Sequence, residues 1–175
     1  CPNPSGENYL MDVIVQDNSC PVPLYDTLRV EIEILVPPND APEITTNTDF
    51  NPVEGCYESR VVIGEGFSLQ VLIDDINQDT VEVTAFGNGF DLGELGMEFE
   101  DQVGLPILST AFTWNPQCED IDRLLNGADS AEYQVFFVAN DRRKCDLEAA
   151  FDTTCINLVL IAPSDSNTAP ILTTD

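Results

Sequence analysis

A loop near the middle of the chain carries acidic and amide side chains at alternate positions. Asp75, Asn77 and Asp79 stand within the segment DDINQD, which follows an apolar run. Side-chain oxygens at this spacing allow one loop to turn several ligands toward a single hard cation, and calcium prefers such ligands. The spacing therefore indicates a calcium-binding loop. An ordinary solvated acidic turn at the end of a strand is the alternative.

Other common site chemistries are excluded or poorly supported. The chain has no histidine, which removes imidazole acid–base chemistry, Ser-His-Asp triads and the usual zinc patterns. Its 32 acidic residues make chance carboxylate pairs common, and none is set apart in an apolar setting that would separate two pKa values. Trp114 could stack on a sugar, but its place beside Phe112 in an alternating strand favours the core. We predict that the protein is not an enzyme.

Composition and charge limit the class of protein and its partners. The 175 residues are 43% hydrophobic and carry a formal charge of −26, which indicates a folded, strongly acidic protein rather than a disordered one. Nucleic acid is excluded as a partner because only six basic residues are present. No apolar run is long enough to span a membrane. The absence of a signal peptide predicts an internal segment of an exported protein.

Two segments of the chain repeat each other in order. Tyr-x7-Asp-x2/3-Cys begins at Tyr9 and again at Tyr133, and an aromatic-Asp-Thr leads into an alternating strand at Tyr25 and at Phe151. Each copy then ends in a similar phrase, NDAPEITT and NTAPILTT, and the offsets drift only from 124 to 128. Ordered agreements of this kind predict tandem repeats. We divide the chain into the last strands of one repeat (1–37), a complete repeat (38–166) and the start of a third (167–175).

The complete repeat has the pattern of an all-β sandwich. Short alternating runs rich in β-branched and aromatic residues occur in it at 67–73, 80–86, 109–114, 133–139 and 155–162, as at 28–36 in the preceding repeat, and Gly, Asn, Asp and Pro clusters separate them. About seven such strands in roughly 125 residues predict an immunoglobulin-like or cadherin-like β-sandwich. Residues 118–130 are the one segment for which we expect a helical turn.

The repeat also predicts how the six cysteines pair. Cys20 corresponds to Cys145 and Cys1 to Cys118, which selects one of the fifteen connectivities that six cysteines allow. The predicted disulfides are Cys1–Cys20, Cys118–Cys145 and, for the two that remain, Cys56–Cys155. Free buried thiols are the alternative. Disulfides in turn imply an oxidising, extracellular compartment.

The segment AFTWNPQC, followed by Tyr-x-Val-x-Phe-x-Val-x-x-Asp and a later Cys, resembles a known repeat. It is similar to the cadherin-like and immunoglobulin-like repeats of very large surface proteins in gliding bacteria, including gliding-motility adhesins exported by the type IX secretion system. The resemblance covers residues 112–170 best, and residues 9–42 almost as well. It implies an extracellular, non-enzymatic array on the cell surface that holds adhesive tips away from the cell.

The Asn-Asp-Ala-Pro junction also resembles the linker of cadherins, in which linker residues and the next domain bind calcium together. The ligands that this resemblance implies come from the linker, the acidic loop and a later strand: Asn39, Asp40, Asp75, Asn77, Asp79 and Asp141. The chain departs from the cadherin pattern at Val36-Pro37-Pro38, where an acidic residue is expected. It departs again at Asn167-Thr168, where Asp165 is displaced, so the second junction is expected to bind calcium weakly or not at all. Pro37-Pro38 alone could also stiffen the hinge.

Two functions from different classes remain. The first is a structural spacer of a multi-repeat adhesin or surface filament, whose partners are the neighbouring repeats of the same chain. The second is a module that binds a glycan or protein through the loop region 87–106. The consecutive Arg142, Arg143 and Lys144 hold half of the positive charge in one loop, and they could dock an acidic neighbouring repeat or simply be solvated. The junction phrases favour the spacer.

Overall fold

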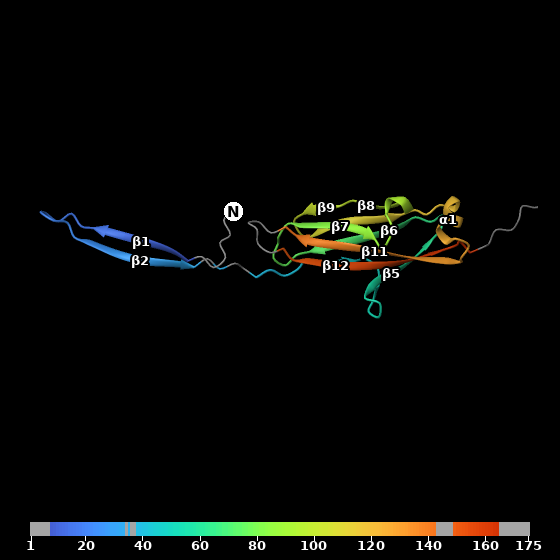
Figure 1. Ribbon diagram of the computed structural model, residues 1–175, viewed down its shortest axis with the longest axis horizontal. Coiled ribbons are helices and arrows are strands. Elements are labelled where there is room, and N and C mark those ends of the chain that lie inside the picture. The colour runs from blue at the N-terminus through green and yellow to red at the C-terminus, as the bar shows by residue number, and fades with distance from the viewer. Residues whose placement is uncertain (1–7, 34, 36–37, 143–148, 165–175) are drawn as a thin grey trace, which may run out of the picture. The chain divides into compact units, whose positions relative to one another are not determined.

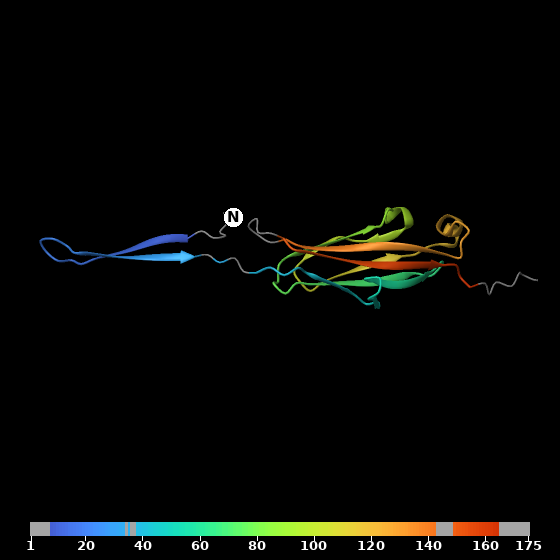
Figure 2. The same ribbon diagram turned by 60° about the horizontal axis from the view of Figure 1, so that its bottom comes forward.

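The computed structural model describes residues 8–33, 35, 38–142 and 149–164. These residues divide into an N-terminal unit that ends at Asn39 and a larger unit that begins at Asp40. Each unit is described by itself. Figures 1 and 2 show the first as a β-hairpin and the second as two packed sheets.

The N-terminal unit contains an antiparallel hairpin of β1 (Asn8–Gln16) and β2 (Tyr25–Glu33). Its turn is organised by Asp17, whose carboxylate accepts hydrogen bonds from the backbone N–H of Leu24 and Ser19. These bonds, above all the one from Leu24, lower the pKa of Asp17. Across the strands, Arg29 forms an ion pair with Asp12 at 2.8 Å, which also lowers the pKa of Asp12.

The larger unit is a sandwich of two sheets. One has the strand order β3 (Glu43–Thr46), β6 (Phe67–Asp74), β10 (Leu108–Trp114), β8 (Met97–Phe99). The other has the order β4 (Phe50–Asn51), β5 (Cys56–Val62), β12 (Phe151–Ile161), β11 (Ser130–Asp141), β7 (Val81–Gly87), β9 (Gln102–Gly104). All pairings are antiparallel except the one between β5 and β12, which is parallel. Such a pair needs a long connection, and here almost the whole sandwich lies between its two strands.

The core forms because the strands alternate apolar and polar residues. Leu69, Val71 and Ile73 of β6 face Val135 and Phe137 of β11, and all five are fully buried. Trp114 is also buried, and its indole N–H donates to the Leu95 carbonyl at 2.9 Å. The prediction that this tryptophan belongs to the core is therefore confirmed.

Three short helical segments cover the connections: η1 (Gly93–Leu95), η2 (Cys118–Asp120) and α1 (Ile121–Leu125). The last two form the helical turn predicted within residues 118–130. They join β10 to β11 at the end of the sandwich where β12 ends (Figure 1). Tyr133 of β11 fixes this connection, because its hydroxyl donates to the Leu124 carbonyl at 2.9 Å. Burial raises the pKa of Tyr133, and the bond has the form of the tyrosine corner found in immunoglobulin folds.

One disulfide is formed among the described residues, between Cys56 of β5 and Cys155 of β12. It joins neighbouring strands of one sheet at the start of their parallel pairing. Cys20 and Cys118 are exposed, and neither forms a disulfide with another described cysteine. Their predicted partners, Cys1 and Cys145, lie outside the described residues, so the pairs Cys1–Cys20 and Cys118–Cys145 stay predictions.

The hairpin and the last two strands of the sandwich share one register. β1 and β2 place Tyr9 opposite Ile32, and β11 and β12 place Tyr133 opposite Leu158. Shifts of 124 residues in the first strand and 126 in the second convert one pair into the other. The same shifts convert Met11 opposite Val30 into Val135 opposite Ile156 and Val13 opposite Leu28 into Phe137 opposite Thr154.

Candidate functional site

Several predicted cation ligands lie at one end of the sandwich. Asp75 follows the inward alternation of β6 past its last residue and is 1% exposed. Asp141 is the last residue of β11 and is fully buried. Both carboxylates therefore stand where the alternation would place the next core residue. Burial of a charged group is costly unless partners compensate, so the partners of these two residues are decisive.

Asp75 is only partly satisfied. Its Oδ1 accepts a hydrogen bond from the backbone N–H of Asp79 at 3.1 Å, which curls the loop DDINQD back on itself. Gln78 supports the curl with a positive φ of 61° and a side-chain bond to the Asp75 carbonyl. The other oxygen, Asp75 Oδ2, is buried and has no hydrogen-bond partner in the part of the chain that the structure describes. An unpartnered buried carboxylate oxygen can accept a cation.

Asp141 is held beside this loop. Its Oδ1 accepts the backbone N–H of Ala150 at 2.7 Å, and Asp141 pairs with Val81 in the ladder between β11 and β7. The backbone N–H of Arg142 then donates to the Thr80 carbonyl at 2.6 Å. The strand ladder thus brings Asp141 to the residues that directly follow the acidic loop.

The residues before β3 reach the same loop. The backbone N–H of Asp40 donates to Asn77 Oδ1 at 2.8 Å. Asn39, whose side-chain oxygen is buried, is the last residue of the N-terminal unit and is not counted in this set. Of the six predicted ligands, the structure thus brings Asp40, Asp75, Asn77, Asp79 and Asp141 to one end of the sandwich by these contacts.

An acidic depression adjoins this end. It has a volume of about 510 Å³ and is lined by Asp40, Ala41, Glu43, Asp74, Ile76 and Gln78. Glu43 and Asp74 stand directly opposite each other in the ladder between β3 and β6. Like charges in this position oppose sheet pairing, and a bound cation would relieve the repulsion.

The fit to a metal is partial. Within the described ranges, no three or more His, Cys, Asp and Glu side chains are grouped closely enough to hold a metal ion. Amide and main-chain oxygens, which calcium accepts, would have to complete any site. Asp152 was not among the predicted residues, although its carboxylate accepts the backbone N–H of Ile44 at 3.2 Å and so ties β12 to β3. Alternate residues of β12 point inward, so counting back from buried Ile156 by twos would have placed Asp152 on the inner face.

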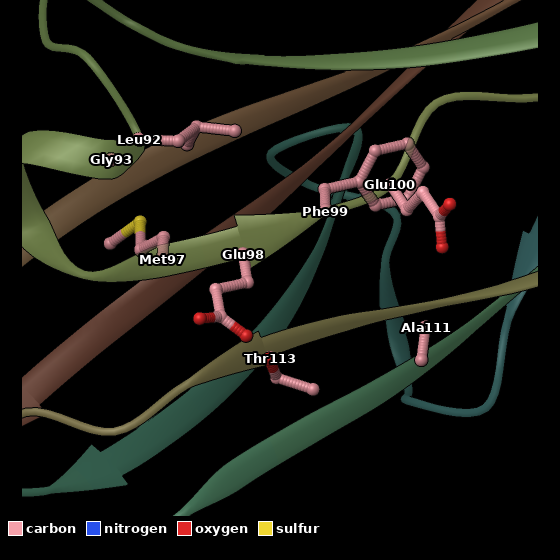
Figure 3. A pocket seen from close by; sticks show the side chains of 8 residues that line it. All are labelled: Leu92, Gly93, Met97, Glu98, Phe99, Glu100, Ala111 and Thr113. Carbon is pink, nitrogen blue, oxygen red and sulfur yellow. The ribbon is translucent and has the colours of Figure 1, made fainter.

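The loop region 87–106 also contains a depression, of about 600 Å³ (Figure 3). It is lined by Leu92, Gly93, Met97, Glu98, Phe99, Glu100, Ala111 and Thr113. In Figure 3 the carboxylate of Glu98 points toward Thr113. The loop region is thus hollowed as a contact surface requires. Its polar side chains are mainly carboxylates, which disfavour an anionic ligand.

The basic loop is described only at its first residue. Arg142 forms an ion pair with Glu82 of β7, with 2.7 Å between Arg142 Nε and Glu82 Oε2. It is thus engaged within its own sheet. Arg143 and Lys144 lie outside the described residues, so docking of an acidic neighbour through this loop stays a prediction.

No known protein family matches the chain, and no curated protein matches it. Solved structures do. A chimeric titin Z1Z2 matches with 16% identity and a TM-score of 0.39, over 72% of this chain and 99% of that one. The sialic acid binding region of a Streptococcus sanguinis SK1 adhesin matches with 16% identity and a TM-score of 0.45, over 74% of this chain and 32% of that one. The CooA pilin subunit of enterotoxigenic Escherichia coli matches with 9% identity and a TM-score of 0.34, over 71% and 99%.

Likeness at these identities concerns the fold and says nothing of function. The strand order and the parallel β5–β12 pair, together with the tyrosine corner, define an immunoglobulin-like β-sandwich. The predicted fold class is confirmed at this level, whereas its tandem repetition stays a prediction. Among the described residues, no helix is long and apolar enough to cross a membrane.

Proposed function

We propose that this chain is a spacer segment of an extracellular, non-enzymatic, multi-repeat adhesin or surface filament. One observation carries the proposal, namely that the hairpin of β1 and β2 has the register of β11 and β12. The residues that this register aligns with buried Val135 and Ile156 are Met11 and Val30. A two-stranded hairpin is marginally stable alone, so its apolar face calls for the rest of a sandwich like the one that follows.

Two further observations agree with an extracellular, calcium-containing environment. The Cys56–Cys155 disulfide is typical of proteins that fold in oxidising compartments. The strong negative charge is compatible with calcium and incompatible with nucleic acid. The finer proposal, a gliding-motility adhesin exported by type IX secretion, rests on the sequence resemblance alone.

We also propose that calcium stiffens the junction before β3. Asp75 Oδ2 is the buried oxygen that needs a partner, and Asp40, Asn77, Asp79 and Asp141 would supply further oxygens. Calcium would neutralise these carboxylates and fix the acidic loop against the linker. Extracellular calcium modules bind with dissociation constants of about 0.1–1 mM.

Thermal and urea unfolding of the whole chain test the calcium proposal, in 5 mM calcium and then in chelator. With a dissociation constant of about 0.1 mM, calcium should stabilise the folded state by about 2 kcal/mol. Asp75→Asn keeps the acceptor for the Asp79 N–H but loses the charge, so it should abolish the shift. Asp122→Asn, an exposed residue of α1, should keep the shift. Equal melts with and without calcium would mean that the acidic residues serve solubility alone.

Small-angle scattering on one, two and three copies of residues 38–166 joined in tandem tests the spacer itself. A spacer should give an extended particle whose length grows in equal steps with copy number. A flexible, collapsed chain of folded domains would contradict the proposal.

The second candidate, a ligand-binding module that uses the 87–106 region, is favoured only by the depression shown in Figure 3. A ligand whose binding is lost in Glu98→Ala would establish it.

A further inference from the structure

The outer face of the larger sheet carries a stacked pair of aromatic rings, one exposed and one half-buried. Phe86 of β7 and Phe136 of β11 stand directly opposite each other in the ladder. Their rings are stacked, with centroids 5.3 Å apart and planes 21° apart. Phe86 is 49% exposed, so the ring pair offers an apolar surface to solvent. Neither ring belongs to the core cluster.

A row of amides runs beside the rings, two residues further along each strand. Asn88 Nδ2 donates to Gln134 Oε1 at 2.8 Å, and Gln134 Nε2 donates to Asn157 Oδ1 at 3.1 Å. Asn157 Nδ2 then donates to Glu54 Oε2 at 2.7 Å. Gln134 Nε2 also donates to Cys56 Sγ at 3.5 Å, so both of its N–H groups are engaged. Because an amide has two N–H donors and an oxygen with two lone pairs, the oxygen of Gln134 and the amides of Asn88 and Asn157 keep capacity for further bonds. The relay fixes the orientation of the groups that a ligand would meet.

The ring pair and the amide row together form one surface, which a depression borders. Residues two apart on a strand are separated by about 7 Å, so a ligand lying across the strands could contact the rings and the amides together. On the other side of the amide row is a depression of about 450 Å³, lined by Asn88, Phe90, Glu132, Tyr133, Gln134 and Asn157. Aromatic surface with a few fixed polar groups at its margin is the usual composition of a ligand site.

The charges around this surface select the kind of ligand. Glu54 and Glu132 stand at its margin, the lining residues include no lysine or arginine, and the whole chain carries −26. Sialylated, sulfated and uronic glycans are therefore repelled. Uncharged sugars meet no such penalty.

We propose that the ring pair and the amide row bind a neutral hexopyranose glycan. One face of a pyranose presents C–H groups, which pack on the electron-rich face of an aromatic ring. Its hydroxyls both donate and accept hydrogen bonds, as side-chain amides do. The ring would lie on Phe86 and Phe136, and the hydroxyls would reach Gln134 and Asn157. This role goes beyond the spacer and does not depend on calcium.

Titration of the isotope-labelled whole chain, followed by amide NMR, tests this proposal. The probes are neutral tetrasaccharides of glucose, galactose, mannose and N-acetylglucosamine, with sialyllactose as the acidic comparison. At least one neutral probe should bind in the millimolar range and shift the amides of β7, β11 and β12. Sialyllactose should bind at least about tenfold more weakly.

Variants locate the contact. Phe86→Ala and Gln134→Ala should each weaken binding by about tenfold, whereas Phe151→Ala, an exposed phenylalanine at the start of β12, should leave it unchanged. Melting checks that each variant folds, and Phe86→Leu replaces Phe86→Ala if the latter unfolds.

Three results would overturn the proposal. The first is that no neutral probe shifts these amides. The second is that binding is equal in Phe86→Ala and in the Phe151→Ala control. The third is self-association that Phe86→Ala abolishes, which would make this face an interface between copies. None of the three bears on the calcium-dependent melt or on the scattering of tandem copies, so the calcium and spacer proposals would stand or fall separately.

Discussion

Removal of the Cys56–Cys155 disulfide should destabilise the sandwich strongly. The bond joins residues that are 99 positions apart, so it restricts almost the whole unfolded domain. In the loop-entropy treatment, a closed loop of about 100 residues corresponds to about 4.7 kcal/mol at 25 °C. Domains of this size have total stabilities of about 5–15 kcal/mol. The double variant Cys56→Ala/Cys155→Ala should therefore lose a third or more of its stability, and its Tm should fall by roughly 14–20 °C.

Urea unfolding, monitored by tryptophan fluorescence, measures this loss, because Trp114 is buried in the same core. The free energy of unfolding should fall and the m-value should rise, since the unfolded chain without the bond exposes more surface. Cys20→Ala is the matched control, because Cys20 lies in the hairpin unit and should leave the transition of the sandwich unchanged. A loss below about 1 kcal/mol would refute the loop-entropy reasoning. A full loss at constant m-value would instead place the cause in native packing around Cys56.

Three smaller effects can be measured in the same unfolding assay. Tyr133→Phe removes the bond to the Leu124 carbonyl and should cost about 1 kcal/mol. Since burial raises the pKa of Tyr133 above its ordinary value near 10, the folded state keeps the phenol proton to higher pH. Its contribution is complete below about pH 10 and is lost as the pH rises further, and Tyr133→Phe should flatten this alkaline decline. Gly87→Val should cost about 1–3 kcal/mol of stability by overpacking. The ring of Phe90 lies where a Cβ of residue 87 would stand, and this ring packs edge-on against Tyr133. If Thr84→Val costs as much as Gly87→Val, overpacking at Phe90 is not the cause.

The core strands could be predicted from the sequence because alternation is a local signal. β6, β7, β10, β11 and β12 form within a few residues of the predicted ranges. β5 was missed because its segment, CYESRVV, mixes charged and apolar residues. Its place in the sheet depends on a parallel partner 99 residues away, which no local pattern encodes.

The candidate sites could be predicted only where ligands cluster in sequence. Asp75, Asn77 and Asp79 were found from their spacing within one loop. Asp152 was missed because its neighbours in space come from a different strand. The ring pair of Phe86 and Phe136 likewise depends on the register of β7 with β11, which no single segment reveals.

The parallel pairing of β5 with β12 determines how the sandwich would carry a mechanical load. If tension enters before β3 and leaves after β12, the two strands are drawn in opposite directions along their axes, and their hydrogen bonds are sheared together rather than opened one by one. The Cys56–Cys155 bond crosses this pair and would bear the load covalently. It keeps the enclosed residues from extending, which withholds roughly 330–360 Å of chain length from each domain. Such a domain would transmit pulling forces at nearly constant length.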